Sequence, residues 1–269
     1  MSRFLSRLAF VACLIAIPAW LAWSFSVAGS QSDGRVYDAS ENAMADVDAA
    51  LAQAKADKKL LLIALGANWC HDSRAFGSRF SNPDFAATMQ KSYEILFVDV
   101  GYLDTGFDVI KRFGPPVIYG TPTVLVIDPE TEVLLNPKDH TIWRDSYKIS
   151  LADTLKAFEK IAADRTAQLS SSAISPALQG LYGQIDAFEQ KMANRVYAGF
   201  AIVGPMLAES RAGGEMPKNL GSYWKQLAKF RYAVTDDLRG LRDDAAKRVA
   251  AGEANISIAW PNYEPFDWE

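Results

Sequence analysis

Cysteine is scarce in this chain of 269 residues, which contains only Cys13 and Cys70. Cys13 lies inside an N-terminal apolar segment, so the folded part of the chain keeps a single thiol. Exported proteins often use paired cysteines to stabilise their folds. That role is excluded here, because Cys70 has no partner within the folded part. Its presence therefore has to be explained by chemistry or by packing.

The chain also has no excess of basic residues and no recognisable set of metal ligands. Its 28 Lys and Arg face 32 Asp and Glu, with no basic stripe, which excludes nucleic acid as a partner. The two histidines, His71 and His140, form no ligand pair with zinc-finger spacing, so no metal site is expected. There is no phosphate-binding glycine loop or dinucleotide fingerprint, and no Ser/His/Asp triad, so no cofactor is expected either.

The first 30 residues differ from the rest. Arg3 and Arg7 form a basic start, and the 21 residues 8–28 form an uncharged, mainly apolar run that ends in small residues. This layout predicts either a cleaved signal peptide or a retained membrane anchor over residues 1–30. Both alternatives place the protein in the periplasm or cell envelope, soluble after cleavage or tethered through residues 8–28. A polar linker follows over residues 31–40.

Residues 41–167 alternate between helical and strand patterns. Helices are expected over 41–58 with Ser40 as N-cap, 70–80, from 83 with Asn82 as N-cap, 104–113 and 151–163, and strands over 60–65, 95–100, 123–127 and 132–135. The order predicts an α/β domain with helices on both faces of a central sheet. The last two strands form a hairpin, which makes the predicted sheet mixed rather than purely parallel.

Residues 173–269 carry a different pattern. Two long amphipathic stretches, separated by Gly213-Gly214 and Pro217, predict an all-α helical hairpin. The hairpin would offer a partner surface or a dimer interface. The tail, residues 260–268, is aromatic, acidic and rich in proline. It either wraps over its own domain, as its large aromatic area favours, or serves as a docking peptide for a partner.

The motif that carries chemistry is Trp69-Cys70-His71-Asp72-Ser73, which follows the first predicted strand. A cysteine at the start of a helix meets free backbone N–H groups and the positive end of the helix dipole, which both favour the thiolate. A protonated His71 would add to this effect and Asp72 would oppose it. Ser73, one turn along, could donate a hydrogen bond to the sulfur.

Residues 41–163 resemble the thioredoxin-like family. The matching pieces are Leu60–Leu65, Trp69–Ser73 and Gly120–Asp128. The resemblance implies a thioredoxin-like fold, with Pro122 at a family-like 52 residues after Cys70. It also implies that the Thr121-Pro122 peptide bond is cis and faces the sulfur, and that Trp69, His71, Asp72, Thr121 and Pro122 contact the substrate.

Two positions depart from the family pattern. Ser73 stands where a resolving cysteine is usual, which makes a CxxS motif, and Ala64 stands where many thioredoxins carry a buried acid. Cys70 could still form a mixed disulfide with a disulfide- or thiol-bearing protein substrate. Release would then need a thiol of the substrate or an external thiol such as glutathione. The leading hypothesis is therefore a thiol-disulfide oxidoreductase or isomerase-like enzyme with Cys70 and Ser73 as catalytic residues.

Two alternatives stay open. One is a catalytically degenerate thioredoxin-fold module that binds a polypeptide without turnover. The other is a redox sensor in which Cys70 is oxidised to sulfenic acid.

Overall fold

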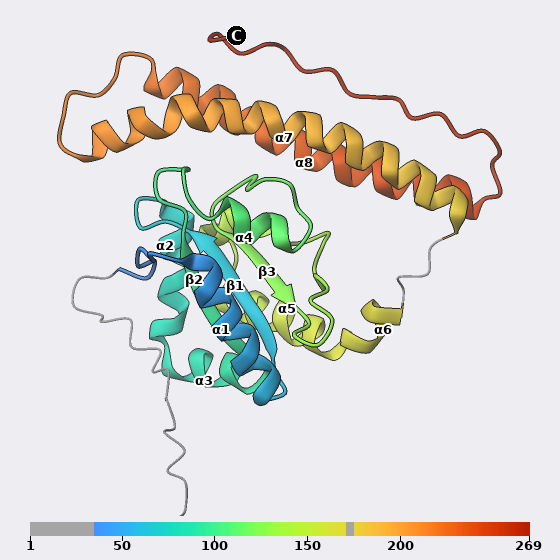
Figure 1. Cartoon of the computed structure of the whole chain (residues 1–269), viewed down its shortest axis with the longest axis horizontal. Helices are drawn as coiled ribbons and strands as arrows, with labels where there is room; N and C mark the ends of the chain where they lie inside the picture. Colours follow the sequence, from blue (N-terminus) through green and yellow to red (C-terminus); the bar gives the residue numbers. More distant parts are fainter. Residues whose placement is uncertain (1–34, 171–174) are drawn as a thin grey trace, which may run out of the picture.

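The computed structural model describes residues 35–170 and 175–269 (Figure 1). The predicted signal peptide or anchor, residues 1–30, lies outside these ranges, as does the start of the predicted linker. Within the described ranges, no helix combines the length and the apolar character needed to span a membrane.

A three-stranded sheet forms the centre of the first domain. β1 (Leu60–Gly66) lies in the middle, β2 (Tyr93–Asp99) pairs with it in parallel and β3 (Thr123–Ile127) pairs with it in antiparallel orientation. All seven residues of β1 are buried, as its unbroken apolar sequence predicts. The mixed α/β sheet expected from the sequence is confirmed.

Helices cover both faces of this sheet (Figure 1). They are α1 (Ala43–Ala56), α2 (His71–Ser78), α3 (Pro83–Ser92), α4 (Phe107–Arg112), α5 (Leu151–Ala163) and α6 (Arg165–Ser170), with the 3₁₀ helices η1 (Arg79–Ser81) and η2 (Ile142–Lys148). Leu61, Ile63 and Leu65 share one core with α1 and α4. Leu62 and Ala64 share a second core with α2, α3 and α5. Alternate residues of β1 thus serve opposite faces, as strand geometry requires.

Two local predictions were wrong. α1 begins after Asn42, whose side chain accepts the N–H of Ala45, whereas Ser40 bonds to Asp46 instead. The fourth strand expected over residues 132–135 is reduced to a single bridge between Ile127 and Leu134.

The missing strand has a physical reason. Glu132 adopts a positive φ, which turns the chain where the strand should begin. The amide side chain of Asn136 then takes over the strand's role, because its oxygen accepts the N–H of Val126 and its nitrogen donates to the carbonyl of Val124. A side chain therefore satisfies two backbone groups on the edge of β3.

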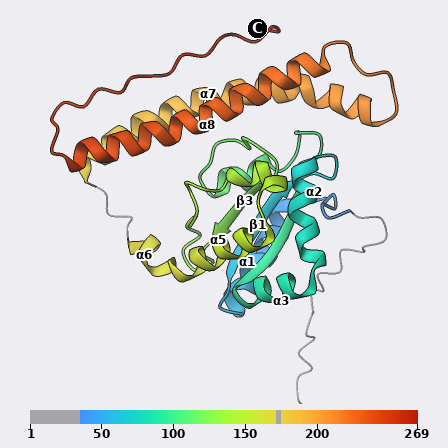
Figure 2. The same cartoon turned by 180° about the vertical axis from the view of Figure 1, so that it is seen from behind.

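The second domain is the predicted helical hairpin, formed by α7 (Pro176–Arg211) and α8 (Leu220–Ala250). It lies across the end of the sheet where β1 and β2 finish and β3 begins (Figures 1 and 2). α7 and the loop after β2 lie close together at Gly204. A Cβ atom added to Gly204 would overlap the carbonyl oxygen of Tyr102 in that loop. The hydroxyl of Tyr197 donates to the carbonyl oxygen of Pro116 at 2.8 Å.

The C-terminal tail runs along the hairpin on the side away from the sheet (Figure 1). Phe266 is buried and packs against Phe230 of α8, with 5.1 Å between ring centroids. Arg195 of α7 lies over both rings and pairs with the side chain of Glu269. The tail therefore covers its own domain, in agreement with the first of the two interpretations.

Candidate functional site

Cys70 lies at the junction between β1 and α2. The strand ends at Gly66, a short turn follows, and Cys70 forms the N-cap of α2 with extended backbone angles. The turn is closed by a hydrogen bond from the N–H of Cys70 to the carbonyl oxygen of Ala67 at 3.0 Å. The side chain is partly exposed. The thiol thus lies at a helix start, where the sequence predicts it.

The Thr121-Pro122 peptide bond is cis and directly precedes β3. The Cys70 thiol donates to the carbonyl oxygen of Thr121 at 3.2 Å. The predicted cis bond is confirmed, and it brings Thr121 against the sulfur across 51 residues of sequence. This hydrogen bond exists only for the protonated thiol, because a thiolate has no proton to donate and would face a carbonyl oxygen.

Ser73 occupies the place of a second cysteine, but its side chain is not accessible to solvent. Its side chain is fully buried, and its hydroxyl has no hydrogen-bond partner in the described part of the chain. The expected hydrogen bond from Ser73 to the sulfur is not present. The hydroxyl of Tyr37 donates to the carbonyl oxygen of Ser73 at 3.3 Å, and burial raises the pKa of Tyr37 far above its usual value.

Trp69 connects the two domains. Its indole N–H donates to the carbonyl oxygen of Gly101 at 2.6 Å, and its ring is stacked on Tyr102. Trp69 also makes an edge-to-face contact with Trp224 of α8, with 5.8 Å between the ring centroids. Trp69 is thus held by the hairpin on one side and by the loop after β2 on the other.

The open side of the site is formed by His71. Its side chain is 59% exposed and its ring lies 4.5 Å from the ring of Tyr147, which is itself among the most exposed aromatics. The carboxylate of Asp72 accepts the N–H of Tyr147 at 2.9 Å and so fixes η2 beside the motif. Nothing in the sequence around Tyr147 marks η2 as part of the site, because its place there depends on this contact with Asp72.

The loop before β3 is covered. Thr121 and Pro122 are both buried, although the resemblance places them in a substrate groove. Arg144 of η2 packs so closely on Gly120 that a Cβ atom there would overlap its side chain. Arg144 donates to Thr235 of α8 at 2.5 Å. Part of the expected docking surface is therefore occupied by the chain itself.

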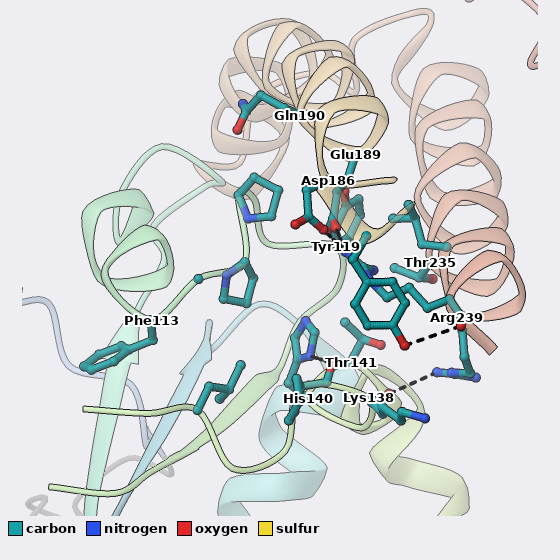
Figure 3. A pocket seen from close by; sticks show the side chains of 18 of the residues that line it. Phe113, Tyr119, Lys138, His140, Thr141, Asp186, Glu189, Gln190, Thr235 and Arg239 are labelled. Carbon is teal, nitrogen blue, oxygen red and sulfur yellow. Dashed lines mark hydrogen bonds and ion pairs between the residues drawn. The ribbon is translucent and has the colours of Figure 1, made fainter. Parts of the chain in front are cut away.

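A cavity of about 540 Å³ lies between the two domains (Figure 3). Its wall includes His140, whose Nδ1 is 2.8 Å from the carbonyl oxygen of Pro137 and whose pKa is lowered to about 4 by burial. It also includes Tyr119, whose buried hydroxyl has no hydrogen-bond partner among the described residues. The size suits a small molecule. Within residues 35–170 and 175–269, no cluster of three or more His, Cys, Asp or Glu could hold a metal ion.

The chain is similar to known proteins over part of its length. Residues 42–129 match the model of a thioredoxin-like family, so the chain contains a thioredoxin-like domain. The chain is also similar to the crystal structure of a disulphide isomerase from Xylella fastidiosa Temecula1. The two are 30% identical, with 46% of this chain and 95% of the other covered and a TM-score of 0.43. The comparison with curated proteins gives no match.

Proposed function

We propose that the protein acts in thiol-disulfide exchange through Cys70 and that it works as a monothiol. The observation that carries the proposal is the placement of the Cys70 sulfur at a helix start, 3.2 Å from the carbonyl oxygen of Thr121 in the cis Thr121-Pro122 loop. A structural cysteine needs no such surroundings, whereas a nucleophilic thiol benefits from the helix dipole.

The chemistry proceeds in two exchanges. The Cys70 thiolate attacks one sulfur of a substrate disulfide, forms a mixed disulfide with it and expels the other sulfur as a thiolate. In the second exchange, another thiolate attacks the mixed disulfide and expels Cys70 in its reduced form. If that thiolate belongs to the substrate, the disulfide has been isomerised. If it belongs to an external thiol such as glutathione, that thiol is left in a disulfide with the substrate.

The second thiolate cannot come from the described part of this chain. Ser73 occupies the resolving position, and Cys70 is the free cysteine of the described residues. Substrate would reach the sulfur from the side of His71 and Tyr147, because Trp69, Thr121 and Pro122 are held against the chain's own residues. The inner wall of the site is then formed by Trp69, Thr121 and Pro122, which do not form its entrance.

The proposal also includes the cellular location of the protein. Residues 1–30 would export the protein to the periplasm or envelope, as a cleaved signal or as a tether through residues 8–28. Disulfide-bearing protein substrates are found in that compartment. A dimer through the hairpin is a further proposal, which the size of the protein in solution would test.

The test is the trapping of a mixed disulfide. The protein without residues 1–30 is incubated with a disulfide-bonded, unfolded protein and separated on a non-reducing gel. We expect an adduct that disappears with reductant and is absent from the Cys70→Ala variant. Ser73→Ala serves as the matched control, since it leaves the sulfur in place. No adduct with any disulfide substrate would overturn the proposal.

One observation favours a second candidate function. Because Thr121 and Pro122 are buried, the fold has lost part of the surface on which a substrate would lie. A thioredoxin-fold module that binds a polypeptide through the hairpin would tolerate that loss. It predicts that Cys70→Ala binds its partner as the wild type does, whereas disruption of the hairpin abolishes binding.

A further inference from the structure

The cavity between the two domains has walls from both of them (Figure 3). The first domain contributes residues between 113 and 119 and between 134 and 141, and the hairpin contributes residues of α7 and α8. Its volume of about 540 Å³ lies in the range of small-molecule sites. Much of the wall is apolar, with contributions from Phe113, Pro115, Pro116, Leu134 and Leu238. A molecule that fills this space therefore needs an apolar body.

The three carboxylates that line the cavity already have partners. Asp186 and Glu189 of α7 both pair with Arg242 of α8, at 2.8 and 2.6 Å. Asp243 pairs with Lys138 at 3.1 Å. A cationic ligand would have to compete with these internal ion pairs, so the cavity does not favour a positive charge.

Arg239 is the lining cation that is left over. Its side chain is exposed, and in the described part of the chain no carboxylate lies within ion-pair distance of it. Its guanidinium donates to the carbonyl oxygen of Lys138 at 3.5 Å, which directs it from α8 toward the first domain. A neutral carbonyl leaves the positive charge uncompensated, so a ligand carboxylate would be attracted to Arg239.

His140 offers a hydrogen-bond acceptor to the cavity. Its Nδ1 lies 2.8 Å from the carbonyl oxygen of Pro137, and because a carbonyl can only accept, this nitrogen carries the proton. Burial lowers the pKa of His140 to about 4, so the ring is neutral at pH 7 and Nε2 is an acceptor. No described residue donates to Nε2, and the side chain is partly exposed. A hydroxyl suits this nitrogen, whereas a carboxylate has no proton to donate to it.

We propose that the cavity binds a small hydroxy acid with an aromatic or branched apolar body. The hydroxyl donates to Nε2 of His140, the carboxylate lies against Arg239, and the body packs between the loop at Pro115-Pro116 and Leu238 of α8. Because both domains contribute to the wall, the bound ligand joins the first domain to the hairpin. The inference does not depend on the chemistry of Cys70.

The first experiment titrates the full chain with para-hydroxyphenylpropionate in a calorimeter. We expect saturable binding with a Kd of about 1 mM or below, as suits a ligand of this size. Phenylpropionate, which lacks the hydroxyl, should bind about fivefold more weakly, the effect of one lost hydrogen bond. The amide and amine analogues of the hydroxylated acid should each bind at least about threefold more weakly, since neither carries a negative charge. The absence of saturable binding by the acid, equal affinity of the two acids, or equal affinity of acid and amine would each overturn the inference.

Variants then place the ligand in this cavity. Arg239→Gln should weaken binding of the acid about threefold, as expected for an exposed charge pair, and leave binding of the amide unchanged. The matched control, Lys229→Gln, removes an exposed cation of the same helix that does not line the cavity and should follow the wild type. An effect of Arg239→Gln no larger than that of Lys229→Gln would overturn the inference.

His140→Phe should abolish the advantage of the hydroxyl, so that the two acids bind with equal affinity. A purely structural role of His140 would weaken both acids alike and keep their ratio, and that result in a folded variant would overturn the inference. If His140→Phe fails to fold, the ratio of the two acids in the wild type and the Arg239→Gln result decide the question. The mixed-disulfide test of Cys70 is independent of all these titrations.

Discussion

Replacement of Gly204 by alanine tests how the hairpin sits on the thioredoxin-like domain. In most exposed helical positions, alanine is more favourable than glycine by about 1 kcal/mol. At Gly204, however, the added Cβ would overlap the backbone carbonyl oxygen of Tyr102. A normal C···O contact needs about 3.3 Å, and a backbone oxygen cannot move aside as the end of a side chain can. α7 would have to withdraw from the loop after β2.

The expected net effect is a loss of stability. An overpacked contact typically costs about 1–3 kcal/mol, which exceeds the gain in helix propensity, so we expect Gly204→Ala to lower the free energy of unfolding by about 1–2 kcal/mol. Gly180→Ala is the matched control, because Gly180 lies in the same helix with open space around its Cα, and it should raise stability slightly. Urea unfolding followed by circular dichroism measures both. Equal stability of the two variants would refute the close approach described for α7.

Three further predictions follow from single positions. Ser73→Cys should create a dithiol with Cys70 that oxidises internally and no longer reacts with a thiol reagent until it is reduced; two persistently free thiols would contradict the placement of residue 73 one turn from the sulfur. Stability should fall as the pH drops from about 6.5 to about 4, because the folded state keeps His140 neutral while the unfolded chain takes up the proton, with a loss of at most about 3 kcal/mol; chemical denaturation should show a flatter dependence for His140→Gln. Trp224→Ala should cost about 2 kcal/mol by removing the edge contact with Trp69, and Trp224→Phe should recover part of it in the same assay.

The sequence predicts best where local signals are strong and agree. The limits of β3 and α5 match the expected ranges, and α3 starts after its predicted cap, Asn82. An apolar run identifies the central strand, and the cis bond before Pro122 follows from the family resemblance. In each case the information lies within a few neighbouring residues or in a motif.

What the sequence could not show are contacts between separate elements of the fold, both within the first domain and between the two domains. The sequence places Trp224 in an amphipathic helix, and nothing near it in the chain points to a contact with Trp69, more than 150 residues away. Tyr147 lies in η2, which is bonded to the carboxylate of Asp72 through its own N–H. The lost fourth strand depends on the Asn136 side chain, whose pairing with backbone groups has no pattern in the sequence.

The central claim is that Cys70 captures a disulfide and needs an outside thiol for release. The most direct measurement counts the substrate thiol set free per molecule of protein from a small disulfide reagent in excess. We predict one equivalent without added thiol and continued turnover once glutathione is supplied. Repeated turnover without any external thiol, or no release at all, would contradict the account.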